Sequence, residues 1–441
     1  MLFLKIVAIV LSLCAISFLV YGSSAASLTV NAQSYLQTIK YRNLVIDLGN
    51  GVKTNAQLTY PAVGRGGNGT FPGVLLIHGT GPADMNETIG YIRIDNQTGA
   101  KIYPTAQTFF QIAEYLSERG FAVLRYDKRA VGANTTILDS NVWGNLTFND
   151  LKQDAEKALA VLAQQPEVDI NKITLLGHSE GTVIVPRVAI DNPGKVNNIA
   201  LMGAVAQNFR ELLYLQQVTT PLLYAQNVLD HRHDELLSVQ EASNNPVFSS
   251  MIGNLTLLPT QNITTTNGTT TTTAIEQLHP EYNTDNDTFI SINDELKPRL
   301  IENFESFSVV TPGEKCTEIA GCPIWLRSEY ALEPTLNIIG KVPSDTNILI
   351  LQGENDTQTT IQQAFLLQQR LTEVNHPDHM LITYPNLGHL FYPSSQWLTG
   401  VGPIQEYVLA DLYSWLESHS GFTHIPAVMP SYNSSSTKGQ G

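Results

Sequence analysis

The segment from Ile173 to Gly181 reads ITLLGHSEG and places a serine on a short turn directly after an apolar run that predicts a buried strand. The residues after it, 182–190, are largely compatible with a helix, although Pro186 should bend it. A G-x-S-x-G pattern between a strand and a helix is typical of a nucleophile elbow, in which a strained turn exposes the serine hydroxyl. The glycines leave room for the turn, and the helix N-terminus stabilises negative charge. We therefore predict that Ser179 is a catalytic nucleophile.

Apolar runs alternate with helical patterns on both sides of this segment. Residues 44–48 and 56–60 predict an opening hairpin, and a helix over 151–162 is expected to be capped by Asn149 or Asp150. Further strands are predicted at 74–77, 121–126, 173–176, 196–202, 347–352 and 380–384, and further helices at 106–118, 361–371 and 404–416. This alternation predicts an α/β fold, with a mostly parallel sheet and helices on both faces.

The alternation is interrupted in the middle of the chain. Helical pieces and prolines occur there, together with a threonine-rich run over 264–273 that we expect to be a solvated loop. The predicted organisation is a signal peptide or N-terminal anchor (1–26), a core in two parts (27–204 and 344–425), a mainly helical insertion (205–343) and a disordered tail (426–441).

A loop upstream of the elbow predicts the oxyanion-binding groups. His78-Gly79-Thr80-Gly81 follows an apolar strand, and a loop in this position supplies a backbone donor to the oxyanion of acyl transfer. We expect the backbone N–H groups of Thr80 and Glu180 to be the donors, with Gly81 as the alternative to Thr80.

The acid and the base of a triad on this fold follow the serine in the order carboxylate, then histidine. The strand over 347–352 ends in Gly353-Glu354-Asn355-Asp356, and the strand over 380–384 is followed by a loop that ends at His389. We predict Asp356 as the acid and His389 as the base. Glu354 is the weaker alternative, because it lies closer to the strand end.

The other histidines are weaker candidates for chemistry. His231, His233 and Asp234 resemble a metal-ligand cluster, but a solvated helix face is the better interpretation because no third partner is evident. His178 is expected to be a packing residue rather than a base. No metal and no cofactor are expected.

Four islands of sequence carry a family resemblance: HGTGPAD from His78, RYDKRAVG from Arg125, GHSEG from Gly177, and LQGEND from Leu351 together with YPNLGHLF from Tyr384. They resemble the serine esterases of the α/β-hydrolase superfamily, in its serine aminopeptidase-like or dienelactone hydrolase-like branch. Thr182 and Ala130 depart from this pattern, since relatives often have glycine there. The resemblance implies an α/β-hydrolase fold in which the insertion forms a helical lid over the active site.

The expected reaction is acyl transfer to water through an acyl-enzyme on Ser179. Hydrolysis of carboxylic esters is the first interpretation, with a small-molecule ester or a short peptide as the substrate. The alternative is a serine peptidase or amidase, which would use the same triad to cleave amide bonds instead of esters. A catalytically silent binding protein on a hydrolase fold is a further alternative, which retention of all three triad residues disfavours.

Charge and the N-terminal segment bear on partners and location. A formal net charge of -15 argues against nucleic acid binding, which needs basic patches. Lys5, an apolar run over 6–20 and small residues over 22–26 predict an export signal. An uncleaved membrane anchor is the alternative. We therefore expect a secreted or extracytoplasmic protein, anchored to a membrane if the segment is retained.

Two further patterns agree with export. Cys316 and Cys322 are expected to form a disulfide that closes a small loop. Sequons for N-glycosylation occur at Asn68, Asn86, Asn96, Asn134, Asn145, Asn254, Asn262, Asn267, Asn286, Asn355 and Asn433. Their number fits a glycosylated surface, with Asn355 expected to stay unoccupied because it lies beside the predicted triad acid.

Overall fold

The computed structural model describes residues 39–62, 70–89, 93–94, 101–102, 106–243, 245, 248, 251–257, 260–264, 270–274, 276–308, 323–394 and 402–421. The predictions for the N-terminal segment, for the Cys316–Cys322 disulfide and for the tail lie outside these residues. Within the described ranges, no helix has both the length and the apolar character needed to cross a membrane.

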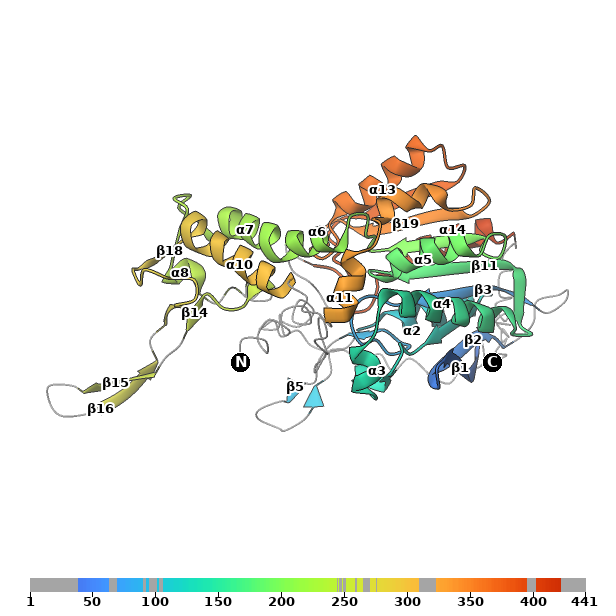
Figure 1. The fold of residues 1–441 in the computed structure, drawn as a ribbon, viewed down its shortest axis with the longest axis horizontal. Helices are drawn as coiled ribbons and strands as arrows, with labels where there is room; N and C mark the ends of the chain where they lie inside the picture. The colour runs from blue at the N-terminus through green and yellow to red at the C-terminus, as the bar shows by residue number, and fades with distance from the viewer. Residues whose placement is uncertain are drawn as a thin grey trace, which may run out of the picture.

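An eight-stranded sheet forms the centre of the molecule, in the order β1-β2-β8-β3-β11-β12-β19-β20 (Figure 1). Pairs β1–β2 and β2–β8 are antiparallel, and the other five pairs are parallel. The strands are β1 (Ile39–Gly49), β2 (Val52–Pro61), β3 (Phe71–Ile77), β8 (Ala122–Tyr126), β11 (Val168–His178), β12 (Asn198–Met202), β19 (Asn347–Gly353) and β20 (His379–Tyr384). The mostly parallel sheet expected from the alternating pattern is therefore present.

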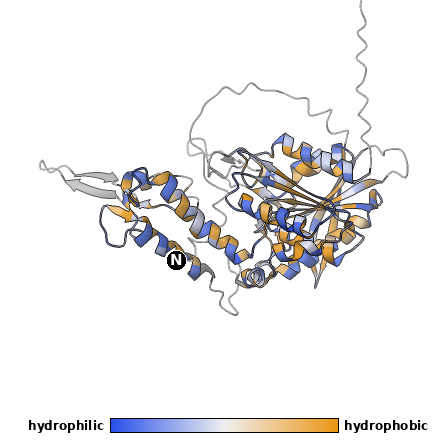
Figure 2. Cartoon of the chain, turned by 90° about the horizontal axis from the view of Figure 1, so that it is seen from above, coloured by the Kyte–Doolittle hydropathy of each residue, from blue (hydrophilic) through white to orange (hydrophobic). Residues whose placement is uncertain are grey.

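Helices cover both faces of the sheet. Helices α2 (Thr108–Glu118) and α14 (Glu406–His419) pack on one face, and α4 (Phe148–Ala163), α5 (Gly181–Asp191) and α13 (Ile361–Glu373) pack on the other. The central strands are buried on both sides, because Val74 and Leu76 of β3 belong to one apolar cluster while Leu75 and Ile77 belong to the other. Figure 2 shows these hydrophobic surfaces meeting between the helices and the sheet. Each fully buried aliphatic side chain of this kind stabilises the fold by about 1.5–3 kcal/mol.

The start of α4 differs from the prediction. The helix begins at Phe148, and Thr147 rather than Asn149 or Asp150 is the capping residue. The Thr147 hydroxyl accepts a hydrogen bond from the Asp150 N–H, and the Asp150 carboxylate accepts one from the Thr147 N–H at 2.9 Å. This reciprocal capping box satisfies two N–H groups that the first helical turn leaves without partners.

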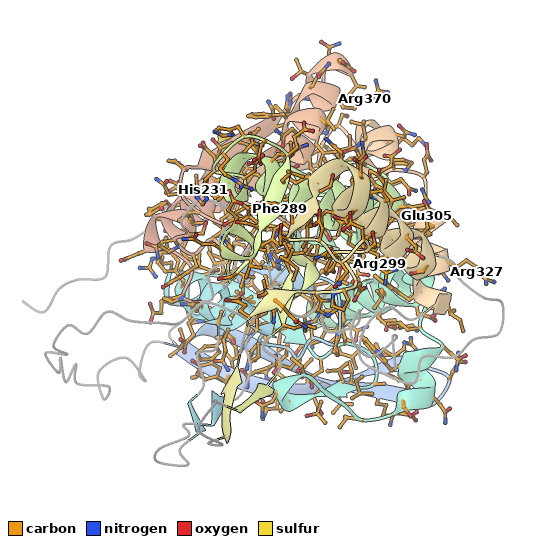
Figure 3. The ribbon with its side chains drawn as sticks, turned by 90° about the vertical axis from the view of Figure 1, so that its left-hand side faces the viewer. His231, Phe289, Arg299, Glu305, Arg327 and Arg370 are labelled. Carbon is orange, nitrogen blue, oxygen red and sulfur yellow. The ribbon has the colours of Figure 1, made fainter. Side chains whose placement is uncertain are left out.

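The insertion extends away from the core as a helical arm (Figure 1). Segments α6 (Phe209–Tyr214), η3 (Leu215–Thr219), α7 (Thr220–Tyr224) and η4 (Ala225–Leu229) run consecutively outward, and η5 (Ile292–Leu296) and α10 (Lys297–Ser308) return. An ion pair of 2.9 Å between Arg210 and Glu305 joins the start of the first run to the end of the second. Figure 3 views the molecule from the outer end of the arm and labels His231, Arg299 and Glu305 among its side chains.

The threonine-rich run corrects a prediction. Strands β15 (Thr260–Thr264) and β16 (Thr270–Ala274) pair antiparallel, so the described residues of the expected loop, 264 and 270–273, lie in a two-stranded ribbon. The prediction failed because it required an apolar period. β-branched threonine favours an extended backbone, which a sequence of this kind can adopt without an alternating apolar pattern.

The remaining elements are short. They are β4 (Thr88–Ile89), β5 (Arg93–Ile94), β6 (Lys101–Ile102), β7 (Ala106–Gln107), β9 (Val131–Gly132), η2 (Ala133–Thr135), β10 (Thr136–Ile137), α3 (Ser140–Gly144), β13 (Leu236–Ser238), α8 (Val239–Ala242), β14 (Thr256–Leu257), β17 (Gln277–Leu278), β18 (Phe289–Ser291), α11 (Pro323–Tyr330), α12 (Thr335–Ile338) and η6 (Ile339–Lys341).

Candidate active site

Ser179 occupies a strained turn between β11 and α5. Its φ of 54° lies in the left-handed region, which a residue with a side chain rarely adopts. A Cβ atom at Gly177 would lie 2.3 Å from the Gly181 carbonyl oxygen, and one at Gly181 would lie 2.1 Å from that of Ile77. Only glycine fits at either position, so the two glycines of the pattern are required by the close approach of the backbone.

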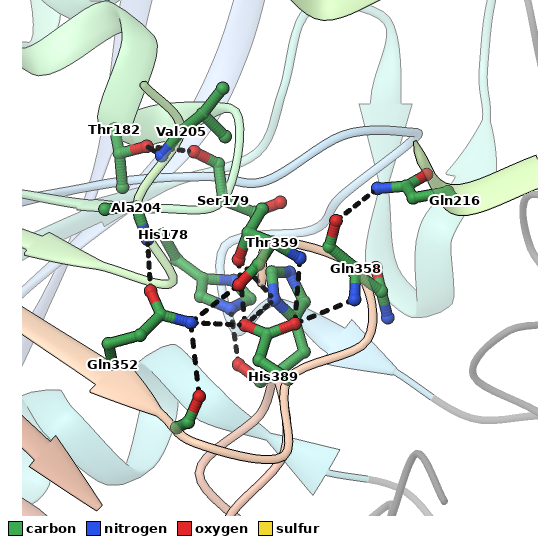
Figure 4. Close-up of polar contacts among 12 residues, drawn as sticks. His178, Ser179, Thr182, Ala204, Val205, Gln216, Gln352, Gln358, Thr359 and His389 are labelled. Atoms are coloured by element: carbon green, nitrogen blue, oxygen red, sulfur yellow. Dashed lines mark hydrogen bonds and ion pairs between the residues drawn. The ribbon is translucent and has the colours of Figure 1, made fainter. Parts of the chain in front are cut away.

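Thr182 holds the turn in place. Its hydroxyl donates to the Ser179 carbonyl oxygen at 2.6 Å and accepts from the Val205 N–H at 3.0 Å (Figure 4). The Ser179 N–H donates to the carbonyl oxygen of Met202, the last residue of β12, at 2.9 Å. The Thr182 hydroxyl therefore links the elbow to the loop after β12.

A buried pair of side chains lies beyond the ends of β19 and β20. His389 Nδ1 is 2.8 Å from Asp356 Oδ2, and both side chains are buried. The second oxygen, Oδ1, accepts the N–H groups of Gln358 and Thr359, each at 2.8 Å. Gln352 Nε2, at 3.0 Å, and the Thr359 hydroxyl, at 2.8 Å, donate to Oδ2 (Figure 4).

These contacts keep the Asp356 carboxyl ionised. Burial raises its pKa, but the His389 imidazole and the hydrogen bonds from Thr359 outweigh burial and leave the pKa below its ordinary value. Glu354, the alternative acid, is exposed and accepts a hydrogen bond from the Thr383 hydroxyl at 2.9 Å. Of the two carboxylates beyond β19, only Asp356 therefore contacts His389.

Ser179 and His389 are both drawn in Figure 4, but no hydrogen bond joins them among the described residues. The ring of His178, the residue before the serine, lies with its centre 4.8 Å from that of His389. Hydrogen bonds to a nucleophile are often long before a substrate is bound. The arrangement is therefore compatible with a triad.

The predicted oxyanion loop lies against the nucleophile. A Cβ atom at Gly79 would be 3.1 Å from Ser179 Cβ. Within the described part of the chain, the N–H groups of Thr80 and Glu180 donate no hydrogen bond, and neither does that of Gly81. The two predicted donors and the alternative therefore have no hydrogen-bond partner among the described residues.

Glu87 and His178 form a link that sequence reasoning missed. Glu87 Oε1 accepts the Gly79 N–H at 2.8 Å and lies 3.0 Å from His178 Nδ1, while His178 Nε2 is 3.2 Å from the His389 carbonyl oxygen. Burial lowers the pKa of His178, but the Glu87 carboxylate outweighs it and raises that pKa. His178 therefore does more than pack: it connects the oxyanion loop to the loop that carries His389.

A second buried cluster surrounds the Glu180 side chain. Its carboxylate lies 2.8 Å from Lys128 Nζ and accepts the Trp325 indole N–H at 2.7 Å. Burial and the negative charge of Glu180 raise the pKa of the Glu329 carboxyl well above its ordinary value. Trp325 and Glu329 belong to α11, so the insertion contacts the core at the elbow.

The candidate metal cluster does not form. His231, His233 and Asp234 are exposed in a turn after η4, not on a helix face as expected. Across the residues that the structure describes, no group of three or more His, Cys, Asp or Glu side chains is arranged to hold a metal ion.

The chain is similar to known proteins at the level of a family, of one curated relative and of solved structures. The family model described as alpha/beta hydrolase fold matches residues 73–395. Esterase EstD of Thermotoga maritima is 32% identical over 158 residues, which make up 34% of this chain and 32% of the esterase, so the match spans about a third of that relative. Among solved structures, the alpha/beta hydrolase GrgF from Penicillium sp. sh18 is 16% identical with a TM-score of 0.45, over 87% of this chain and 100% of GrgF. The proline iminopeptidase of Mycobacterium smegmatis is 13% identical with a TM-score of 0.45, over 86% of this chain and 99% of that enzyme.

Proposed function

The chain belongs to the alpha/beta hydrolase fold family, and on that premise we propose that it is a serine hydrolase that cleaves carboxylic esters. The esterase name of the partial relative from Thermotoga maritima supports the choice of ester over other acyl substrates. The substrate class is a small-molecule ester. The reaction needs no group beyond the side chains and backbone of this chain and a water molecule.

In the proposed mechanism, His389 removes the proton of the Ser179 hydroxyl as the oxygen attacks the ester carbonyl. Asp356 accepts the Nδ1 hydrogen of His389, which leaves Nε2 unprotonated and free to act as the base. The Thr80 and Glu180 N–H groups stabilise the oxyanion. The alcohol leaves with the proton from His389, and water activated by His389 then releases the acid from the acyl-enzyme.

One observation supports the proposal most directly. The buried Asp356 carboxylate is held by five donors, and one of them is the Nδ1 atom of His389. A histidine fixed in this tautomer beside a strained serine turn is the arrangement that acyl transfer requires.

The test is a panel of p-nitrophenyl esters of increasing acyl length, run beside aminoacyl p-nitroanilides. We expect turnover of esters by the wild-type protein, with none by Ser179→Ala, and labelling of Ser179 alone by a fluorophosphonate probe. Faster cleavage of the anilides would assign the site to a peptidase or amidase. Absence of both turnover and labelling would contradict a serine hydrolase and favour a binding protein.

We further propose that the insertion serves as the lid of the site, since Trp325 of α11 contacts the residue after the nucleophile. Export is proposed from the N-terminal segment, with either cleavage or retention as an anchor. Mass spectrometry of the protein from its native host, with and without reduction, tests the cleaved N-terminus, the glycans and the Cys316–Cys322 disulfide together.

A further inference from the structure

Lys128 is a buried lysine with an unusual pair of partners. It lies in the loop after β8, and its side chain is only 4% exposed. The ammonium donates to the Gly79 carbonyl oxygen and lies 2.8 Å from Glu180 Oε2. One cation therefore joins the loop that carries Thr80 to the residue after the nucleophile. These are the two segments that carry the proposed oxyanion donors.

The geometry of the peptide unit makes the contact with Gly79 informative. The Gly79 carbonyl and the Thr80 N–H belong to the same planar unit, and in a trans peptide they point in opposite directions. Holding the carbonyl oxygen on one side thus determines the direction of the N–H on the other. Glycine has no side chain to restrict its own rotation, so an external contact is needed to keep this peptide in one orientation.

The peptide unit before Gly79 is held as well. The Gly79 N–H donates to Glu87 Oε1 at 2.8 Å, so Glu87 and Lys128 restrain the two peptide units on either side of one glycine. No larger residue fits easily there, since a Cβ atom would lie 3.1 Å from Ser179 Cβ. The loop therefore has a glycine close to the nucleophile, with one of its flanking peptide units held by Glu87 and the other by Lys128.

We propose that Lys128 is a positioning residue for the oxyanion hole, which turns the Thr80 N–H toward the nucleophile by binding the Gly79 carbonyl oxygen. The inference rests on the proposed function of the site. The positive charge also polarises the same peptide unit, which strengthens the Thr80 N–H as a donor. Glu180 Oε2 balances the charge, and the Trp325 N–H at 2.7 Å holds the other oxygen of that carboxylate.

The first test is Lys128→Met, which removes the ammonium and keeps most of the apolar stem. Loss of one oxyanion donor typically lowers kcat about 10²- to 10³-fold. A donor that is present but misdirected should cost less, so we expect kcat to fall about 10- to 100-fold while KM changes less than about 3-fold. The Ki of a trifluoromethyl ketone, which forms a tetrahedral adduct with an oxyanion, should rise in parallel with the fall in kcat.

The matched control is Arg129→Met. Arg129 is also buried and lies one residue along the same loop, but it bonds to Asp154 at 2.5 Å and to the Leu48 carbonyl oxygen at 3.2 Å, not to the oxyanion loop. We expect it to destabilise the fold while kcat and the ketone Ki stay within about 3-fold of wild type. Equal kcat losses in the two variants, or an unchanged Ki in Lys128→Met, would overturn the proposal.

A second variant tests the proposal in case Lys128→Met does not fold. Removing one partner of a buried ion pair leaves the other charge unpaired, which costs about 3–5 kcal/mol. The double variant Lys128→Met/Glu180→Gln removes both charges and keeps the backbone N–H at position 180. It should show the same loss of kcat and the same rise in Ki; wild-type values in this variant would overturn the role of Lys128. If the wild-type protein itself cleaves no ester or anilide, the proposed function fails first.

Discussion

Replacement of Asp356 by asparagine is the change whose effect the structure predicts in most detail. Oδ1 of the carboxylate accepts two backbone N–H groups, from Gln358 and Thr359, which cannot reverse their direction. The single carbonyl oxygen of an asparagine must therefore occupy the Oδ1 position. Its NH₂ group then takes the place of Oδ2, where Gln352 Nε2, the Thr359 hydroxyl and His389 Nδ1 all converge.

This orientation forces a change in the histidine. A donor at the Oδ2 position requires His389 Nδ1 to become an acceptor, so the ring hydrogen moves to Nε2 and the atom that should act as the base is blocked. The same change in another serine-triad enzyme lowers kcat about 10⁴-fold. We expect a loss of at least about 10²-fold in kcat/KM for Asp356→Asn, equivalent to about 2.7 kcal/mol of transition-state stabilisation.

The assay is hydrolysis of the best p-nitrophenyl ester, with circular dichroism to check that each variant is folded. Glu354→Gln is the control, because Glu354 lies beyond the same strand but is exposed, and among the described residues its carboxylate accepts a hydrogen bond from the Thr383 hydroxyl alone. It should lose less than about 5-fold, since an exposed hydrogen bond of this kind contributes little. A reversed order of losses would move the acid to Glu354. Small losses in both variants would refute the tautomer argument.

Three further predictions concern stability and modification. Glu329→Gln should remove a pH dependence of the free energy of unfolding. Burial and the Glu180 carboxylate raise the pKa of Glu329 in the folded protein. The contribution of Glu329 to stability is therefore complete below the unfolded-state pKa of about 4.3 and is lost as the pH rises toward the folded-state pKa. In urea unfolding, the free energy of unfolding of the variant should therefore rise relative to that of wild type between pH 4.5 and pH 8. A difference between the two free energies that stays constant over this range would contradict the prediction. Ala130→Gly should raise the unfolding free energy by about 0.5–1 kcal/mol, because Ala130 has a φ of 60°; a lower midpoint in the same assay would be evidence against strain there. In protein from a glycosylating host, peptide mapping should find glycans among exposed Asn134, Asn145, Asn254 and Asn286 but none on Asn355, whose Nδ2 donates to the Ser394 carbonyl oxygen at 3.3 Å; an occupied Asn355 would contradict that.

Features that depend on a few neighbouring residues were the ones that the sequence could predict. The elbow is such a feature, since the glycines of its pattern are required by backbone contacts within the turn and with β3. The prediction for the threonine-rich run was wrong because it considered only the apolar period. The run lacks that period and was expected to be a loop, but its β-branched residues form part of a two-stranded ribbon. The cap of α4 was assigned two or three residues late because Asp150 is the partner of the cap and not the cap itself.

The amino-acid sequence by itself therefore determined the order of strands and helices, the serine turn, and the two strand ends that carry Asp356 and His389. These depend on period, turn chemistry and chain order, which are properties of short segments. Only the tertiary structure decided which charged groups hold the site in place. Glu87 reaches His178 across 91 residues of sequence, and Lys128 reaches Gly79 across 49. Contacts of this kind exist because packed strands bring distant loops to one edge of a sheet, and no pattern within either loop records the partner.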